Sequence, residues 1–570
     1  MPGRAGDSAY AKLQERAAAS GPGSLISRGG SPATVIHQDD KGQTTNQFGA
    51  LSTSSLVQYS SDRAIEALSP TRVKIRGSGH LCLMLGTATL FVKRGAVSIC
   101  GAILPASTRK VNIYSPRSHT LPAIEASLVA IGFPDVWRPL ELDTGAYERT
   151  FHILGYHFTP DPANSKRYTT LNTHDWNPVL TELAEHAKSA DSSPRILVHG
   201  PNNSGVSTFA QNLLNRLVNQ ADPAVGVAFV DLESDRPAFT PPGTIALQQV
   251  KIPVFGPPYT RPAANSGPLS KMHYVGIRGA KNPDIGWHYR CALDLLDDEA
   301  RKGETQPLRP VIIHAPKWLS RLRPGSAEWS EIWDRINPTH IVYLGDSDDP
   351  SIPSDKTVYR LEAKRVEQYD MSRQADMSLQ AYFHMVVSRE GERLFNCAPV
   401  VIDQLKTHSL SFYPYGIVKG VILDDQSIAP EDVAAAITGK IVAVFAVSSE
   451  ALYQLGYDDD QATGKLCQFD GNLNTLPVSP AELGCIGFGF VRAVKERARY
   501  LTLTTPIPAK LLNRAFSHGD KGNPQLILAV SNLNSISKSE MGVNYYDDQG
   551  WYSDERIFTH TYTTPYLMVE

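Results

Sequence analysis

The residues best suited to chemistry form a glycine-bounded loop between a predicted strand over 195–198 and a predicted helix over 205–220. Glycines at both ends allow the backbone to turn its N–H groups toward phosphate oxygens, and the helix N-terminus adds positive potential. A serine or threonine hydroxyl at the end of such a loop holds Mg²⁺. The sequence therefore predicts a nucleotide-binding loop with Ser207 as the magnesium ligand; its residues are Gly200, Asn202, Asn203, Ser204, Gly205, Val206, Ser207 and Thr208.

One position departs from the GxxxxGK[ST] pattern of phosphate loops, because Val206 stands where the pattern has lysine. The loss of one donor aimed at developing charge typically costs about 100- to 1000-fold in rate. The backbone amides of the loop do not depend on that side chain. We therefore expect nucleotide binding to survive the change better than catalysis. A purely structural turn is the alternative interpretation of this segment taken by itself.

The elements around the loop alternate between apolar strands and helices. Strands are predicted over 195–198, 225–231, 311–314 and 340–345, with helices near 205–220, 288–301 and 328–336. This alternation is typical of a parallel sheet with helices on both faces. Ligands of such sheets bind at the carboxyl ends of the strands, where the loop lies.

Glycine-punctuated β-rich runs flank this α/β segment on both sides, between 70 and 135 and beyond 395. The predicted fold is an α/β phosphate-loop domain, with a parallel sheet and flanking helices, between an N-terminal antiparallel β domain and a C-terminal mostly-β domain. The predicted boundaries are a disordered arm over 1–45, the N-terminal β domain over 46–190, the phosphate-loop domain over 191–395, the C-terminal domain over 396–561 and a tail over 562–570.

Composition excludes several classes of protein. Fifty-five basic and 58 acidic residues leave a net charge of −3, so any contact with nucleic acid must be local rather than through bulk charge. Six dispersed cysteines without a CxxC pair predict reduced thiols, no structural zinc and an intracellular protein. No apolar run predicts a membrane span or a secretory signal.

Two proline-rich segments beyond the loop carry a family resemblance. One runs from Val230-Asp231-Leu232-Glu233-Ser234-Asp235-Arg236 to Phe239-Thr240-Pro241-Pro242-Gly243, and the other is Pro253-Val254-Phe255-Gly256-Pro257-Pro258-Tyr259-Thr260. They resemble the D-x-D-x-G-Q-x-E-F-T-P-P-G and P-x-x-G-P-P-[FY]-T signatures of nucleolar polynucleotide 5'-hydroxyl kinases, relatives of the kinase in the messenger RNA cleavage and polyadenylation machinery. Matches at 91–98, 114–122, 338–343 and 487–492 extend the resemblance over roughly 75–510.

The resemblance implies a polynucleotide-kinase-like domain that uses ATP and Mg²⁺ to phosphorylate the 5'-hydroxyl end of RNA. The catalytic carboxylates are then Asp231 and Glu233, and the substrate or lid residues are Arg236, Lys317, Trp318 and Arg373. The resemblance also implies a nuclear, nucleolar location and a higher-order heteromer with an endonuclease that processes pre-ribosomal RNA at its second internal transcribed spacer.

The C-terminal tail is predicted to dock into that endonuclease. In the resembled family the extreme C-terminus supports the nuclease, and an exposed apolar run is costly unless it is covered. The residues concerned are Tyr566, Leu567, Met568 and Val569. Their contact with the chain's own C-terminal domain is the alternative.

Several positions depart from the family signatures. Glu233 stands where the family has a second aspartate, and its extra methylene moves an oxygen by about an ångström. Asp235-Arg236 replaces Gly-Gln, His314-Ala315-Pro316-Lys317-Trp318 replaces N-T-x-G-W, and Ala375 replaces the lid arginine. We therefore expect phosphoryl transfer to be weak or lost.

Three functional hypotheses follow. The first is a scaffold and activator of the endonuclease with weak or lost kinase activity. The second is an active kinase that uses relocated cations, for which Arg236, Lys317 and Arg373 are candidates; each is alternatively a solvated surface charge. The third is a nucleotide-dependent interaction module.

Overall fold

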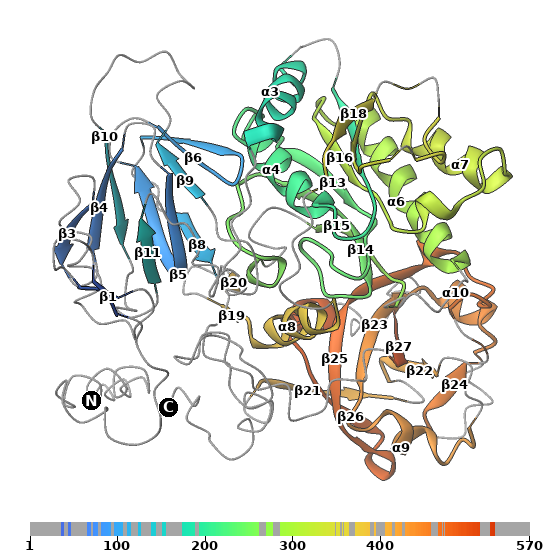
Figure 1. Cartoon of the computed structure of the whole chain (residues 1–570). Helices are drawn as coiled ribbons and strands as arrows, with labels where there is room; N and C mark the ends of the chain where they lie inside the picture. Colours follow the sequence, from blue (N-terminus) through green and yellow to red (C-terminus); the bar gives the residue numbers. More distant parts are fainter. Residues whose placement is uncertain are drawn as a thin grey trace, which may run out of the picture.

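Three large β-sheets follow one another along the chain in the computed structural model (Figure 1). The described residues are 36–38, 44–46, 65–69, 72–77, 81–92, 96–106, 111–115, 123–126, 138–143, 151–155, 174–188, 193–261, 269–276, 285–347, 349–353, 356, 358–363, 371–387, 393–394, 405–412, 416–423, 428–457, 465–469, 471, 473–513 and 525–530.

The first large sheet has nine strands, and its registered pairs are all antiparallel, in agreement with the sequence expectation. The strand order is β3-β4-β10-β5-β9-β6-β7, and β8 and β11 also pair with β5. The long β5 continues through Gly86, so this glycine lies within the strand and does not end it. The bounds are β3 (Ile65–Ser69), β4 (Arg72–Gly77), β5 (Leu81–Val92), β6 (Ala96–Ile99), β7 (Ala102–Pro105), β8 (Val111–Ser115), β9 (Ala123–Ala126), β10 (Arg138–Asp143) and β11 (Phe151–Gly155).

A small separate sheet precedes it. Strands β1 (Ile36–Gln38) and β2 (Thr44–Asn46) pair antiparallel. Both begin within the 1–45 arm that the sequence analysis predicted to be disordered; the rest of that arm and the tail over 562–570 lie outside the described residues.

The second large sheet carries the loop, and its order is β15-β14-β13-β16-β12-β17-β18. Five neighbouring strands are parallel, as predicted: β13 (Val227–Asp231), β16 (Val311–His314), β12 (Arg195–His199), β17 (His340–Leu344) and β18 (Val358–Leu361). The prediction of a purely parallel sheet is wrong at one edge, where β14 (Thr244–Val250) and β15 (Leu269–Tyr274) run antiparallel. The proline-rich segment between β13 and β14 contains no crossover helix, so the chain returns beside the strand it has just left.

Helices cover both faces of this sheet. Because successive strand residues point to opposite faces, Ile196 and Val198 of β12 pack with α4 (Val206–Val218), whereas Leu197 packs with α6 (Gly286–Thr305) and α7 (Ala327–Ile336). Helix α3 (Asn177–His186) follows the short helix η2 (His174–Trp176) and packs against α4. Other short elements here are η3 (Pro258–Thr260) and η4 (Leu319–Arg321).

The third large sheet is mixed, with order β21-β26-β25-β23-β27-β22-β24, and it confirms the mostly-β C-terminal prediction. Its strands are β21 (Thr407–Ser411), β22 (Val418–Ile422), β23 (Ile441–Val447), β24 (Cys467–Phe469), β25 (Leu483–Lys495), β26 (Tyr500–Thr504) and β27 (Gln525–Val530). The short helices of this domain are α9 (Val433–Ile437), α10 (Ser449–Gln454), α11 (Ala509–Asn513), η6 (Pro480–Glu482) and η7 (Glu496–Ala498).

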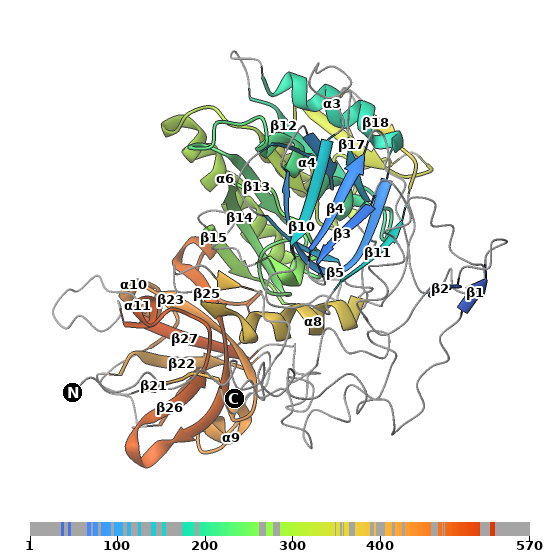
Figure 2. The ribbon, with the colours of Figure 1, turned by 90° about the vertical axis from the view of Figure 1, so that its left-hand side faces the viewer.

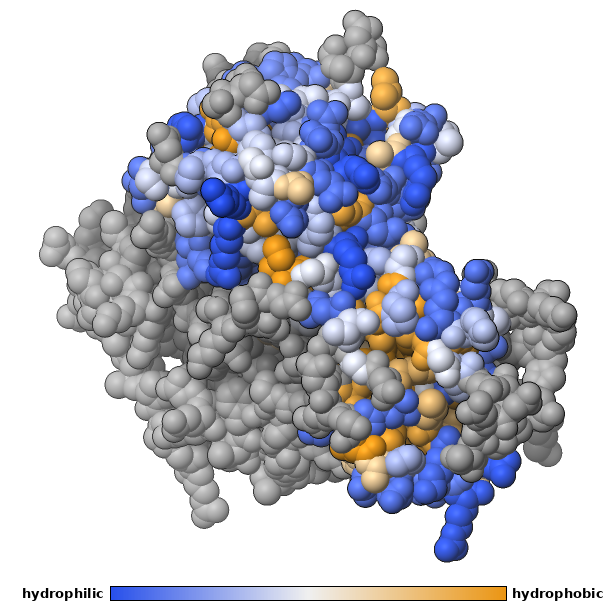
Figure 3. All heavy atoms as spheres, turned by 90° about the vertical axis from the view of Figure 1, so that its right-hand side faces the viewer, coloured by the Kyte–Doolittle hydropathy of each residue, from blue (hydrophilic) through white to orange (hydrophobic). Residues whose placement is uncertain are grey.

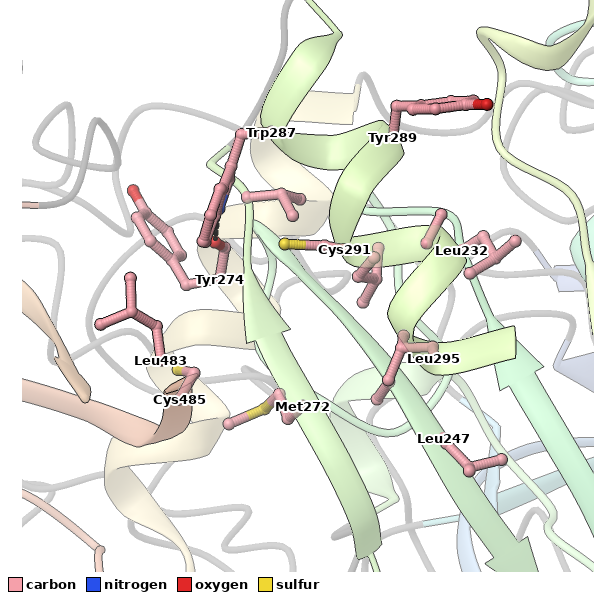
Figure 4. Packing of buried hydrophobic residues seen from close by; sticks show 14 of the residues in the cluster. Leu232, Leu247, Met272, Tyr274, Trp287, Tyr289, Cys291, Leu295, Leu483 and Cys485 are labelled. Carbon is pink, nitrogen blue, oxygen red and sulfur yellow. Dashed lines mark hydrogen bonds between the residues drawn. The ribbon is translucent and has the colours of Figure 1, made fainter. Parts of the chain in front are cut away.

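The antiparallel strand β15 joins the second and third sheets. The Tyr274 ring meets Phe488 edge-on at 5.5 Å and Phe445 at 6.3 Å. Figure 4 shows Tyr274 and Met272 between α6 and the strand that carries Leu483 and Cys485. A single hydrophobic cluster therefore spans both domains.

Helix α8 (Met371–His384) adds a polar link between the same two domains. It packs against η3, and the Tyr382 hydroxyl accepts a hydrogen bond from the Phe488 N–H at 2.9 Å. A small antiparallel pair, β19 (Val386–Val387) and β20 (Arg393–Leu394), follows it.

The N-terminal sheet docks on α4 (Figure 2). Asn215 Nδ2 donates to the Cys100 carbonyl at 2.8 Å, and the Tyr114 N–H donates to the Phe255 carbonyl at 3.3 Å. At Gly101 a Cβ atom would lie 2.2 Å from the Asn212 carbonyl oxygen, so this close approach requires glycine.

The face that carries α7 and α10 is mostly hydrophilic over the second sheet, whereas hydrophobic groups gather on the C-terminal domain (Figure 3). Within the described ranges no helix combines the length and apolar character needed to cross a membrane. The cysteines described there are free: Cys100, Cys291, Cys467 and Cys485.

Candidate nucleotide and phosphoryl-transfer site

The glycine-bounded loop connects β12 to α4 at the carboxyl edge of the parallel strands. Gly205 has φ 101° and Asn203 has φ 60°, which are left-handed values that turn the chain into the helix. A Cβ atom at Gly200 would lie 2.4 Å from the Leu344 carbonyl oxygen and 2.8 Å from Ser204 Oγ. Glycine is therefore required at both ends, and the predicted loop residues form one continuous turn.

Trp176 packs against this turn at Gly205. Its ring is fully buried, contacts Phe209 of α4 edge-on at 5.4 Å, and lies 3.2 Å from where a Gly205 Cβ would stand. Its role in the loop depends on tertiary contact and has no local signal.

Val206 turns its side chain back toward the loop. Its Cγ2 atom lies 3.1 Å from the position of a Gly200 Cβ atom, and the residue is half-buried. At the position of the pattern's lysine the loop thus presents methyl groups and no ammonium donor.

His314 joins two of the predicted site residues. Strands β13 and β16 are parallel with Asp231 opposite His314, so both side chains emerge at the same edge. His314 Nδ1 lies 2.8 Å from Asp231 Oδ1, and His314 Nε2 lies 3.2 Å from Ser207 Oγ. Since a carboxylate only accepts hydrogen bonds, Nδ1 donates to Asp231, and in the neutral ring Nε2 then accepts from the Ser207 hydroxyl.

Asp231 is also bound by its own chain. Its Oδ2 accepts from the Ala238 N–H at 2.6 Å, and its Oδ1 accepts from the Glu233 N–H at 3.3 Å. Only 2% of Asp231 is exposed. Both carboxylate oxygens therefore hold the proline-rich segment and His314 in place.

Glu233 and Asp235 share one cation. Lys317 Nζ donates to Asp235 Oδ2 at 2.7 Å and lies 3.5 Å from Glu233 Oε1. Burial raises the pKa of Glu233, and the nearby Lys317 partly opposes that rise. Glu233 Oε1 also accepts from the Asp235 N–H at 2.9 Å. The lysine therefore compensates acidic charge inside the site.

The remaining predicted substrate or lid residues occupy different places. Arg236 Nη2 donates to Asn203 Oδ1 at 3.3 Å, which brings a guanidinium to the loop. The Trp318 ring is buried, 5.5 Å from His288. Arg373 lies within α8, but its side chain is outside the described part, as are the tail residues Tyr566, Leu567, Met568 and Val569.

Arg261 is a buried cation near the loop that the sequence analysis missed. Arg261 directly follows the second proline-rich signature; its Nε donates to the Gly256 carbonyl at 2.8 Å and its Nη2 to Gln211 Oε1 at 2.5 Å. Burial lowers the pKa of Arg261 to about 10, while the charges of Cys100 and Asp231 oppose the change. Because Arg261 links the proline-rich segment to α4, its position directly after that signature was the available signal.

The loop, Asp231, Glu233, Arg236 and Lys317 lie together at one edge of the sheet, and the catalytic and binding roles predicted for them stay predictions. Over the described ranges no cluster of three or more His, Cys, Asp and Glu residues forms a metal cage. The arrangement suits phosphate binding through backbone N–H groups, with a buried hydrogen-bonded network beside it.

Comparisons with known proteins match this arrangement. The family model for the P-loop of the mRNA cleavage and polyadenylation factor CLP1 matches residues 200–384. The polynucleotide 5'-hydroxyl-kinase grc3 of Neosartorya fischeri is 24% identical over 551 residues, covering 77% of this chain and 64% of that protein. The enzyme of the same name from Aspergillus clavatus is 25% identical over 564 residues, covering 78% and 65%. The chain thus spans a little under two thirds of the length of these curated relatives.

A solved structure of Clp1p in complex with Pcf11p superposes with a TM-score of 0.51 at 13% identity, over 81% of this chain and 98% of that one. A second structure, of an extended interface between Pcf11p and Clp1p, gives 0.50 at 13% identity. At this identity the likeness shows the fold, which is a Clp1-like P-loop domain with a mixed sheet, flanking helices and a mostly-β C-terminal sheet. Together, these findings show that the chain is similar in sequence to grc3-type polynucleotide 5'-hydroxyl kinases and that its P-loop domain is related to that of CLP1.

Proposed function

We propose that this polynucleotide 5'-hydroxyl-kinase homologue acts in the nucleolus as scaffold and activator of an endonuclease that processes pre-ribosomal RNA. Its own ATP-dependent phosphorylation of RNA 5'-hydroxyl ends is weak or lost. The observation that carries the proposal is the engagement of both Asp231 oxygens by groups of the chain itself.

Transfer of a phosphoryl group to a 5'-hydroxyl needs a carboxylate that accepts or orients the hydroxyl proton and cations that offset charge on the migrating group. Asp231 accepts from Ala238, Glu233 and His314, so its oxygens are turned to the protein. The nearby Lys317 is bound to two carboxylates, and Val206 supplies no charge. These features lower the rate of phosphoryl transfer and leave the phosphate-binding turn intact.

The scaffold role draws on contacts that are independent of the reacting groups. The N-terminal sheet is hydrogen-bonded to α4, and the C-terminal domain is joined through β15 and α8. Clp1p, whose fold this chain shares, is solved in complex with the protein Pcf11p. We place the endonuclease contact at the tail over 562–570, with RNA as the further partner.

The test is an assay of label transfer from ATP to a 5'-hydroxyl RNA oligonucleotide, with the purified chain alone and with the endonuclease. The proposal expects transfer near background together with stable pairing and nuclease stimulation. Truncation of 562–570 should weaken both pairing and cleavage. Robust transfer by the wild-type chain, lost in a folded Asp231→Asn protein, would refute the proposal.

A single restoring substitution sharpens this test. Val206→Lys returns the ammonium of the pattern but leaves Asp231 engaged, so we expect it to restore little transfer. Full rescue by Val206→Lys would show that the missing lysine alone limits the reaction.

One observation favours an active kinase as the second candidate. Arg236 reaches the loop through Asn203, so a guanidinium already lies where a relocated cation is needed. In that case Arg236→Ala should abolish transfer, whereas Arg236→Lys should retain part of it.

A further inference from the structure

A magnesium ion in a phosphate loop is held by the loop's Ser or Thr hydroxyl and by a carboxylate at the end of a neighbouring strand. In this chain the corresponding groups are Ser207 Oγ and Asp231 Oδ1. The imidazole of His314 lies between them and is hydrogen-bonded to both, at 3.2 Å and 2.8 Å. The place of the ion is therefore taken by a side chain.

The ring has little freedom to leave this place. Only 3% of His314 is exposed, its backbone is held in β16 between β12 and β13, and its ring faces Phe229 at 6.2 Å. Mg²⁺ requires near-octahedral oxygen ligands at about 2.0–2.1 Å and keeps several waters. An imidazole bonded to two of the oxygens leaves no such arrangement, so the residues present do not fit the ion.

The loop itself still fits phosphate. Ser204 Oγ is fully buried and has no hydrogen-bond partner among the described residues. It lies 2.8 Å from where a Gly200 Cβ would stand, and thus within the curve of the turn. Gly205, the next residue, is the N-cap of helix α4, and Arg236 brings a cation to Asn203. Phosphate charge can therefore be met by the chain's own donors.

We infer that the loop binds the phosphates of a nucleoside di- or triphosphate without a divalent metal ion, with His314 in the ion's place. This replaces the magnesium role that the sequence analysis predicted for Ser207. The inference rests on the proposed function only in sharing its loop. A metal-free site that holds nucleotide but lacks the ion's charge suits a structural nucleotide better than a phosphoryl donor.

The test is calorimetric titration of the full-length chain with ADP, in buffer with Mg²⁺ and in buffer with EDTA. The expected dissociation constants agree within about threefold between the two buffers, a difference under 1 kcal/mol. The rise in melting temperature at saturating ADP should likewise be the same with and without the ion. A wild-type affinity that falls about tenfold or more in EDTA, or no ADP binding in either buffer, overturns the inference.

His314→Asn places the family's residue between Ser207 and Asp231 and opens room for the ion. Its ADP affinity should become magnesium-dependent by about tenfold or more, which corresponds to about 1.4 kcal/mol. The matched control is His408→Asn, in β21 of the C-terminal domain, which should keep the wild-type behaviour. A folded His314→Asn protein that remains indifferent to magnesium would contradict the assigned role of the imidazole.

The wild-type comparison requires no variant, so it decides the inference even if His314→Asn fails to fold. It is also separate from the proposed function. Label transfer to RNA tests the scaffold proposal, whereas ADP binding in EDTA tests the site; either result can fail while the other stands.

Discussion

Asp231→Asn distinguishes a structural carboxylate from a catalytic one. Asp231 accepts three hydrogen bonds at 2.6, 2.8 and 3.3 Å in a buried position. An asparagine offers one acceptor oxygen and an NH₂ group. If its oxygen keeps the Ala238 N–H, the NH₂ group faces the donors of His314 and Glu233.

The cost follows from these contacts. A hydrogen bond to a charged group contributes about 1.5–3 kcal/mol, and a buried donor left unpaired costs about 1–3 kcal/mol. His314 recovers part of this by changing tautomer, so we expect a net loss of about 2–4 kcal/mol. For a domain of this size each kcal/mol lowers the melting temperature by about 2–4 °C. The expected decrease is therefore about 5–15 °C, measured by differential scanning fluorimetry.

Glu233→Gln is the matched control. Burial raises the pKa of Glu233, so folding already disfavours its charged form, and a neutral side chain of the same shape keeps the Asp235 N–H contact. We expect a change in unfolding free energy of under about 1 kcal/mol, because Lys317 retains Asp235. An unchanged melting temperature for Asp231→Asn, together with a large loss for Glu233→Gln, would refute this reasoning.

Two further predictions concern contacts outside the site. Burial acts to raise the pKa of Asp349, but hydrogen bonds from His199 and Ser351 outweigh it and lower the pKa to about 2. The lowered pKa of Asp349 stabilises the fold above the unfolded pKa near 3.8, and this stabilisation is lost as the pH falls through 2. Asp349→Asn should therefore lower the free energy of unfolding by about 2 kcal/mol at neutral pH. The melting temperatures of the wild type and the variant should converge toward pH 2, and a constant difference would contradict the prediction. Tyr382→Phe leaves the buried Phe488 N–H without its acceptor, which should cost about 1–3 kcal/mol of stability and speed hydrogen exchange in α8. Tyr453 is 81% exposed, so Tyr453→Phe is the control and should change neither quantity. Unaltered exchange in Tyr382→Phe would show that the hydroxyl does not hold α8.

The parallel core of the second sheet was predictable because local patterns define it. The strand predicted over 311–314 agrees with β16 at both ends. The antiparallel edge was not recognised, because the runs that form β14 and β15 give no local indication of direction. Their direction follows from the missing crossover helix, and β15 then provides the hydrophobic link to the C-terminal domain through Tyr274.

Site residues divide in the same way. The loop and Asp231 belong to contiguous motifs, so their positions were predictable from the sequence. His314 was noticed only as a departure from a signature, because its contact with Asp231 depends on the register of β13 against β16. The position of Trp176 under Gly205 depends on where α3 packs, which no spacing in the sequence indicates.

Arg236 and Lys317, the two cations near the loop, differ in whether neighbouring carboxylates compensate their charge. Lys317 is paired with Glu233 and Asp235, so its charge is already compensated by neighbouring carboxylates. Arg236 donates to the neutral amide of Asn203, and no carboxylate of the described residues lies within ion-pair distance of it. Its charge therefore remains for phosphate. We expect Arg236→Ala to weaken ADP binding about tenfold or more, the loss of a charge-assisted contact, whereas Lys317→Met should lower stability without changing affinity. The opposite pattern would identify Lys317 as the cation that faces the nucleotide.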